Sequence, residues 1–214
     1  MKALLYKQFR LVCHPMTLMF CLFGAMLMIP SYPYTVVFFY VTLGIFFTFT
    51  NIREQRDIYY AALLPIRKRD TVKASVLFIA IIELTSLVIA IPFAVLSVHI
   101  NPKGGNIVGL DPNVALFGAG LLLFALFNAI FLCAFYKTAY KVGISYLKAV
   151  IPMSLGMIVC EALVHFPGMA WLDAVDRESQ MKQLPILIIG IVVYAVGLLF
   201  TYRCAAKRDE KVDL

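Results

Sequence analysis

The sequence lacks most of the motifs that an enzyme would need. The phosphate-binding pattern G-x-x-x-x-G-K-[ST] is missing, so the chain has no such loop to hold ATP. The patterns H-E-x-x-H and G-x-S-x-G are missing as well, and the three histidines stand singly. The five cysteines show no paired spacing, which argues against a disulfide framework or a cysteine-based metal site. We therefore expect no catalytic residues, no metal site and no cofactor bound by this chain.

Charge is also scarce, at 14% of residues, whereas 62% are apolar, well above the half that is usual for soluble domains. The apolar residues form long continuous runs and do not alternate as they would in a membrane barrel. A helix needs ~20 apolar residues to cross a bilayer. The 214 residues then hold about six such helices and leave no room for a soluble domain. We predict an all-α, multi-pass membrane protein with a single transmembrane domain over residues 1–214.

Six transmembrane spans and one interfacial helix are predicted from these runs. Residues 1–12 place basic side chains on one side of a helix and apolar ones on the other. Such a segment lies on a membrane surface as an elbow before the first span, unless it is a frayed terminus. The predicted spans cover residues 15–29, 35–50, 71–98, 114–136, 149–166 and 185–202.

The basic residues are distributed by side of the membrane. Three of the 19 lysines and arginines, Lys103, Arg177 and Lys182, lie in segments expected on one side, and the other sixteen lie in segments expected on the opposite side. Cytoplasmic loops carry the excess of Lys and Arg, so both termini are predicted to be cytoplasmic. The net charge of +7 therefore reflects topology. We do not expect a nucleic-acid partner, because no single basic patch forms.

Residues 51–73 are the most charged stretch of the chain, with six lysines or arginines between two apolar runs. Asn51 is placed to cap a short helix, with Glu54 in the capping-box position. Pro65 disfavours helical geometry before it and should end that helix. Asp70 is then placed to cap the next span. This pattern predicts a coupling loop over residues 51–70, with a short helix parallel to the membrane that offers a docking surface to a soluble protein.

The basic cluster Arg67, Lys68 and Arg69 has two interpretations. It belongs to that docking surface, or it only sets the topology and touches anionic lipid.

Three polar residues fall inside the predicted spans. A charge at mid-bilayer costs several kcal/mol, so Glu83 and Glu161 should face the protein interior or water. In one interpretation they line a translocation path, where they attract a cation or carry a proton. In the other they are structural carboxyls, hydrogen-bonded to neighbours or across a dimer interface. Asn128 is interpreted as a residue of that path or as a hydrogen-bonding contact between helices.

A family resemblance is carried by the same stretch. Residues 63–73, LLPIRKRDTVK, resemble the leucine-proline, basic, valine-lysine signature of bacterial ABC-2-type transporter permeases, and the acid and aromatics of residues 57–60 fit it. The opening, MKALLYKQFRLV, is similar to the elbow helix of that family. In particular, the chain resembles permease subunits of small-peptide exporters, such as those for phenol-soluble modulins.

The resemblance implies the membrane half of an ATP-binding-cassette exporter of peptide or other amphipathic cargo in a bacterial plasma membrane. Its partners would be a cytoplasmic ATPase subunit, which binds ATP and Mg, and a second permease chain, identical or not. Residues 53–64 would be the coupling helix that docks on the ATPase. The docking residues would be Arg53, Glu54, Arg56, Asp57, Tyr59, Tyr60 and Leu64.

Two other functions stay open at the level of sequence. The chain could be a substrate-binding membrane subunit of an uptake system, which would bind its ligand without a partner. It could also be a membrane sensor or assembly protein, which would have no ATPase partner.

Overall fold

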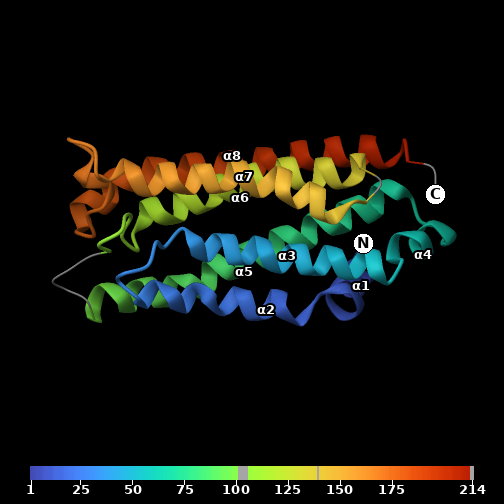
Figure 1. Cartoon of the computed structure of the whole chain (residues 1–214), viewed down its shortest axis with the longest axis horizontal. Helices are drawn as coiled ribbons and strands as arrows, with labels where there is room; N and C mark the ends of the chain where they lie inside the picture. The colour runs from blue at the N-terminus through green and yellow to red at the C-terminus, as the bar shows by residue number, and fades with distance from the viewer. Residues whose placement is uncertain (101–105, 139, 213–214) are drawn as a thin grey trace.

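The computed structural model describes residues 1–100, 106–138 and 140–212, and every element in these ranges is helical, which confirms the all-α prediction. Figure 1 shows the helices side by side along one long axis, with α1 and α4 at the same end. We call this the terminus end, and the opposite end the loop end. The elements are α1 (Lys2–Lys7), η1 (Gln8–Val12), α2 (Pro15–Cys21), η2 (Leu22–Met28), α3 (Val36–Glu54), α4 (Asp57–Leu63), α5 (Lys68–Ile100), α6 (Val114–Lys137), α7 (Val142–Leu163), η3 (Ala170–Leu172) and α8 (Arg177–Asp209).

Five helices in the described part of the chain, namely α3, α5, α6, α7 and α8, are long and apolar enough to cross a membrane. The sixth candidate is a bent pair, in which residues 2–12 and residues 15–28 meet at 96°. The bend lies at His14 and Pro15, where His14 has an extended backbone and its ring accepts a hydrogen bond from the N–H of Met16 at 3.2 Å. Proline suits the first position of a helix, so α2 starts there.

The segment between α3 and α4 differs from its prediction. Asn51 does not cap a new helix, because α3 continues through it to Glu54. Instead, the Asn51 amide donates a hydrogen bond to the Val12 carbonyl at 2.9 Å. The break follows at Arg56, whose left-handed backbone (φ 52°) cannot continue a helix. The short helix is therefore α4, over Asp57–Leu63, and it stops just before Pro65 as expected.

Three of the long helices begin earlier than their apolar runs. α5 starts at Lys68, so Asp70 lies in its first turn and does not cap it. α7 starts at Val142, and α8 starts at Arg177. In α8 the side chain of Asp176 accepts the N–H of Ser179 at 2.9 Å, which is an N-cap. Hydrophobicity marks the part of a helix in contact with lipid and misses such polar first turns.

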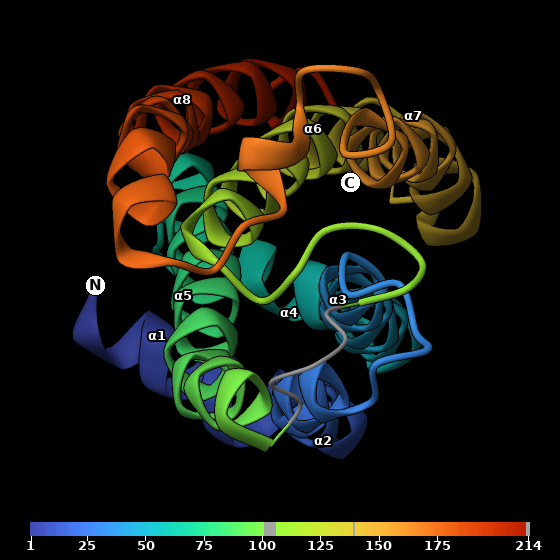
Figure 2. The ribbon, with the colours of Figure 1, turned by 90° about the vertical axis from the view of Figure 1, so that its left-hand side faces the viewer.

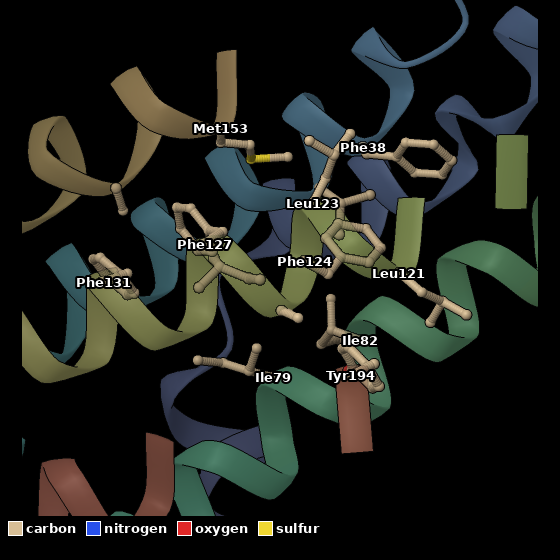
Figure 3. Packing of buried hydrophobic residues seen from close by; sticks show 14 of the residues in the cluster. Phe38, Ile79, Ile82, Leu121, Leu123, Phe124, Phe127, Phe131, Met153 and Tyr194 are labelled. Atoms are coloured by element: carbon tan, nitrogen blue, oxygen red, sulfur yellow. The ribbon is translucent and has the colours of Figure 1, made fainter. Parts of the chain in front are cut away.

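The core is built around α6, the most deeply buried of the candidate spans. Its phenylalanines Phe124, Phe127 and Phe131 are fully buried, and Phe38 of α3 packs edge-on against Phe124 (Figure 3). In a membrane, lipid tails are as apolar as these side chains, so helices associate through close packing and hydrogen bonds.

Helices α6 and α8 approach each other closely at two glycines. A Cβ on Gly190 would lie 2.7 Å from the carbonyl oxygen of Gly118, and a Cβ on Gly118 would lie 2.9 Å from the backbone of Ile186. Both distances are shorter than real Cβ contacts. Small residues at such positions let two helix backbones meet in a bilayer.

Candidate functional site

The terminus end carries an exposed aromatic and apolar surface on α4. Tyr59, Tyr60, Leu63 and Leu64 are all more than half exposed, whereas Ala61 is buried against the body of the protein. The remaining predicted docking residues Arg53, Glu54 and Arg56 are exposed beside them, at the end of α3 and in the break. Aromatic and arginine side chains are the types that concentrate binding energy in protein interfaces. We call Tyr59, Tyr60, Leu63 and Leu64 the α4 surface.

Asp57, the last of the predicted docking residues, points the other way. Its carboxylate pairs with the Lys7 ammonium at 2.8 Å, and both side chains are largely shielded from solvent. The pair joins α4 to α1 across 50 residues of sequence. Next to it, Gln8 is buried and its amide lies 3.4 Å from the Ser75 hydroxyl of α5. The α4 surface is thus held against the N-terminal helix and, through it, against α5.

The basic cluster is engaged by the end of the chain itself. The Lys68 ammonium donates to the carbonyl of Val212 at 2.8 Å, and Arg69 pairs with Glu210. The Arg69 guanidinium lowers the pKa of Glu210. Arg67 is exposed. Two of the three basic side chains therefore bind residues 210–212, and we call this contact the tail latch.

A cavity of about 200 Å³ lies between α4 and the tail latch. Tyr140 closes one side of it, where its hydroxyl donates to Asp209 at 2.9 Å. The packing beneath α4 is therefore incomplete. Its walls are Ile58, Ala61, Ala62, Ile66, Lys68, Thr71, Tyr140 and Asp209.

The membrane-spanning part of the bundle contains a buried polar cluster that joins three helices. Glu83 of α5 is fully buried, and one carboxyl oxygen accepts two hydrogen bonds. The Asn128 amide of α6 donates at 2.8 Å and the Tyr194 hydroxyl of α8 donates at 2.6 Å. The structure thus brings together two of the predicted path residues, Glu83 and Asn128. We call these three residues the central cluster.

Glu161, the third predicted path residue, lies apart from the central cluster, at the loop end. One carboxyl oxygen accepts from the backbone N–H and the hydroxyl of Thr35, at 3.0 and 2.7 Å. The other accepts from the N–H of Leu110 at 2.8 Å. A side chain at Gly109 would overlap this carboxylate, so the glycine is what lets the loop reach it. The carboxyl therefore fastens α7 to the start of α3 and to the loop before α6.

Two further acids complete the loop end. The backbone N–H of Asp111 donates to Asp173 at 2.8 Å, and the Asp111 carboxyl accepts the N–H of Asn106. Burial raises the pKa of Asp111 to about 6, and the negative charge of Asp173 adds to that rise. Burial likewise raises the pKa of Asp173. In the part of the chain that the structure describes, no group of three His, Cys, Asp or Glu side chains is placed to hold a metal ion.

The hydrogen-bond partners of Glu83 and Glu161 were not predicted from the sequence. Tyr194 was detectable, since it is the one side chain with a hydrogen-bonding group in the aliphatic run of residues 184–200. Leu110 was not detectable, because it reaches Glu161 with a backbone N–H group that carries no sequence signal. Thr35 uses its hydroxyl as well as its N–H, but its place at the start of a span gives no sign of a partner 126 residues away. The tail latch was missed because residues 203–214 resemble an ordinary solvated charged tail.

Comparison with known proteins gives one match. The family model described as ABC-2 family transporter protein matches residues 3–204, nearly the whole chain. No curated protein and no solved structure matches it.

Proposed function

The chain belongs to the ABC-2 family of transporter proteins, whose membrane subunits are permeases, and we propose that it is the permease subunit of an exporter driven by a separate ATPase. The match over residues 3–204 is the observation that carries this proposal, since it includes the N-terminal helix, the α4 segment and all the long helices. In this role the chain contributes the translocation path. ATP and Mg are bound by the ATPase, and peptide or another amphipathic molecule is the cargo.

Support for ATPase docking comes from the α4 surface. Three large side chains of this short helix, and that of Leu64 directly after it, are exposed at an end of the molecule that also carries exposed Arg53 and Arg56. Aromatic and arginine side chains around an apolar centre are typical of protein-binding sites. We propose that the ATPase binds here, so that this end faces the cytoplasm.

Coupling to the spans follows from how α4 is held. Only two residues separate it from α3 and four from α5, and the Lys7–Asp57 pair ties it to α1. A displacement of α4 by the ATPase would therefore reach three neighbouring helices at once. The incomplete packing around the 200 Å³ cavity beneath α4 leaves room for such a displacement. ATP binding would then shift the bundle between two access states.

A second permease chain would complete the path. α7 and α8 expose many aliphatic side chains in this single chain, which lipid or a second copy would cover. The central cluster is then the polar element that the moving spans share. Glu83 and Asn128 are our proposed path residues, whereas Glu161, which fastens the loop, is proposed to be structural. The basic cluster and the α4 surface are proposed to face the ATPase.

The docking proposal is tested by co-purification with the ATPase encoded beside this gene. Tyr60→Ala combined with Leu63→Ala should reduce ATPase binding and permease-dependent ATP hydrolysis at least tenfold, because exposed aromatic and aliphatic anchors are removed. Leu199→Ala is the matched control, since Leu199 is equally exposed but lies on α8. Binding that is unchanged in the double variant, or lost equally in the control, would contradict the proposal.

The direction of transport and the identity of the cargo need a separate measurement. Inside-out vesicles that contain the permease and its ATPase should accumulate a fluorescent amphipathic peptide when ATP is added. Right-side-out vesicles loaded with ATP should release it. Accumulation in the opposite sense would identify an uptake system, and ligand binding by this chain alone would favour a binding subunit.

A further inference from the structure

A well-formed recess lies at the loop end of the molecule, between α5, α6 and α8. It has a volume of about 620 Å³. Its wall is almost entirely apolar: Leu87, Ile91 and Val95 come from α5, Phe117 and Leu121 from α6, and Leu187 from α8. Figure 2 looks onto this end of the molecule and shows α6 between α8 and α7, with α5 on the side of α8.

Among the described residues that line this recess, the polar side chains lie at its rim. They are His99 at the end of α5, Asn113 before α6 and Gln180 in α8. Two of them are fixed by backbone carbonyls: the Asn113 amide donates to Leu172 and the Gln180 amide to Val175, each at 2.7 Å. The recess therefore runs from a polar mouth to an apolar interior.

The central cluster sets the depth of the recess. The hydrogen bond from Tyr194 to Glu83 joins α8 to α5 one helical turn below Leu87, which is the deepest α5 residue of the wall. From Leu87 to Val98, at 1.5 Å per residue, the wall extends about 16 Å along α5. The hydrocarbon of one leaflet is half of ~30 Å. The recess is thus about as deep as the hydrocarbon of one leaflet is thick.

We propose that this recess binds one acyl chain of a membrane phospholipid from the leaflet at the loop end, with the headgroup at the polar rim. The match in depth and the change from polar mouth to apolar interior are those of a phospholipid lying in its own leaflet. A helix of a second copy is the competing occupant, and in a dimer it would close the residues of the recess to lipid. The proposal requires only that the chain spans a membrane and is independent of any ATPase.

The proposal is tested with phosphatidylglycerol that carries a photoactivatable diazirine in one acyl chain. The purified permease is reconstituted with this lipid, illuminated and digested, and the labelled residues are located by mass spectrometry. Labels should concentrate at Ile91, Val95 and Phe117. They should be sparse at Val88, which lies on α5 with greater exposure than Ile91 or Val95 but outside the recess. Equal labelling of all exposed apolar positions would overturn the proposal.

Variants that fill the recess give a second readout, which is lipid retained through purification. Ala94 is buried in the wall, so Ala94→Phe should lower retained phosphatidylglycerol at least fivefold. Val95→Trp at the more exposed edge should do the same and guards against misfolding of the first variant. Ala195→Phe, on the exposed face of α8 outside the recess, is the matched control. Retention of phospholipid by both filled variants, or retention of a free fatty acid or a peptide in its place, would overturn the proposal.

Discussion

At the scale of single residues, the two buried glutamates are accommodated differently. Glu161 accepts three hydrogen bonds shared between its two oxygens, as suits an acceptor-only carboxylate. Glu83 receives both of its hydrogen bonds on one oxygen, and its other oxygen has no partner among the described residues. Glu161 therefore fastens a loop, whereas Glu83 keeps an unused hydrogen-bonding position inside the bundle.

The Glu83–Tyr194 hydrogen bond should contribute modestly to stability. Tyr194→Phe removes it without changing the shape of the side chain, and buried hydrogen bonds in membrane proteins are worth ~0.6–1.7 kcal/mol. We expect a loss of about 1 kcal/mol in the free energy of unfolding, measured by denaturant titration in mild detergent. Glu83→Gln keeps an acceptor and should be as stable as the parent. If Glu83→Gln is stable but does not transport, Glu83 acts in the path. If its transport is unchanged, the role of Glu83 is structural.

The folded structure of the loop end should become less stable as pH rises. The pKa of Asp111 is raised to about 6 in the folded chain, from 3.8 for a free side chain, so folding favours the protonated acid. Its contribution to stability is complete below pH 4 and is lost as pH passes through 6. Exchange protection of the Leu110 and Asp111 amides should therefore fall between pH 4 and pH 7.

In Asp111→Asn this decrease should be smaller, because the amide side chain does not ionise. A decrease of the same size in the variant would assign it to another group at the loop end, such as Asp173.

At the scale of helices, hydrophobic runs predicted the apolar bodies of the elements, and Pro65 predicted the end of α4. Polar first turns were missed, because a span continues beyond the lipid wherever a capping residue such as Asp176 supports it. The start of α4 was missed as well. It depends on the left-handed backbone of Arg56, a conformation for which arginine gives no signal. The Glu83–Asn128 contact was within reach, since both residues were already identified as polar groups inside spans.

Helix packing should fail at Gly190 and tolerate change at Gly143. A Cβ at Gly190 would meet the Gly118 carbonyl at 2.7 Å, and overpacking of this kind costs about 1–3 kcal/mol. Gly190→Ala should therefore lower the free energy of unfolding by that amount. At Gly143, in the first turn of α7, a Cβ would meet nothing within 4 Å. Gly143→Ala should be neutral or slightly stabilising, because alanine favours helix. If the two variants lost the same free energy of unfolding, the α6 and α8 backbones would not be in close contact at Gly190.

At the scale of the whole molecule, α1, α4 and the end of α8 lie at one end, and the 106–113 and 164–176 segments lie at the other (Figure 1). This agrees with the separation of basic residues along the sequence, which predicts a cytoplasmic terminus end. The recess at the loop end was beyond sequence analysis, because its walls come from three helices whose contact depends on packing.

The orientation is tested by labelling single cysteines in a variant without the five native ones. Tyr60→Cys lies on α4, and Ile107→Cys lies at the loop end, where Ile107 is 77% exposed. In intact cells a membrane-impermeant thiol reagent should modify the cysteine at position 107 and leave the one at position 60 unmodified until the membrane is opened. The reverse pattern would place the α4 surface outside the cell and remove the basis for ATPase docking.

The position of Tyr194 on α8 has a consequence for biosynthesis. α8 is synthesised after α5 and α6, so until it inserts, the Glu83 carboxyl has Asn128 but not its second donor. A product truncated before Gly190 would lack both this donor and the Gly118–Gly190 contact. Such a chain retains five of the six apolar segments and inserts in the bilayer, yet keeps an incompletely bonded acid there. We expect membrane quality-control proteases to degrade truncated copies selectively, so that full-length permease is the form that accumulates.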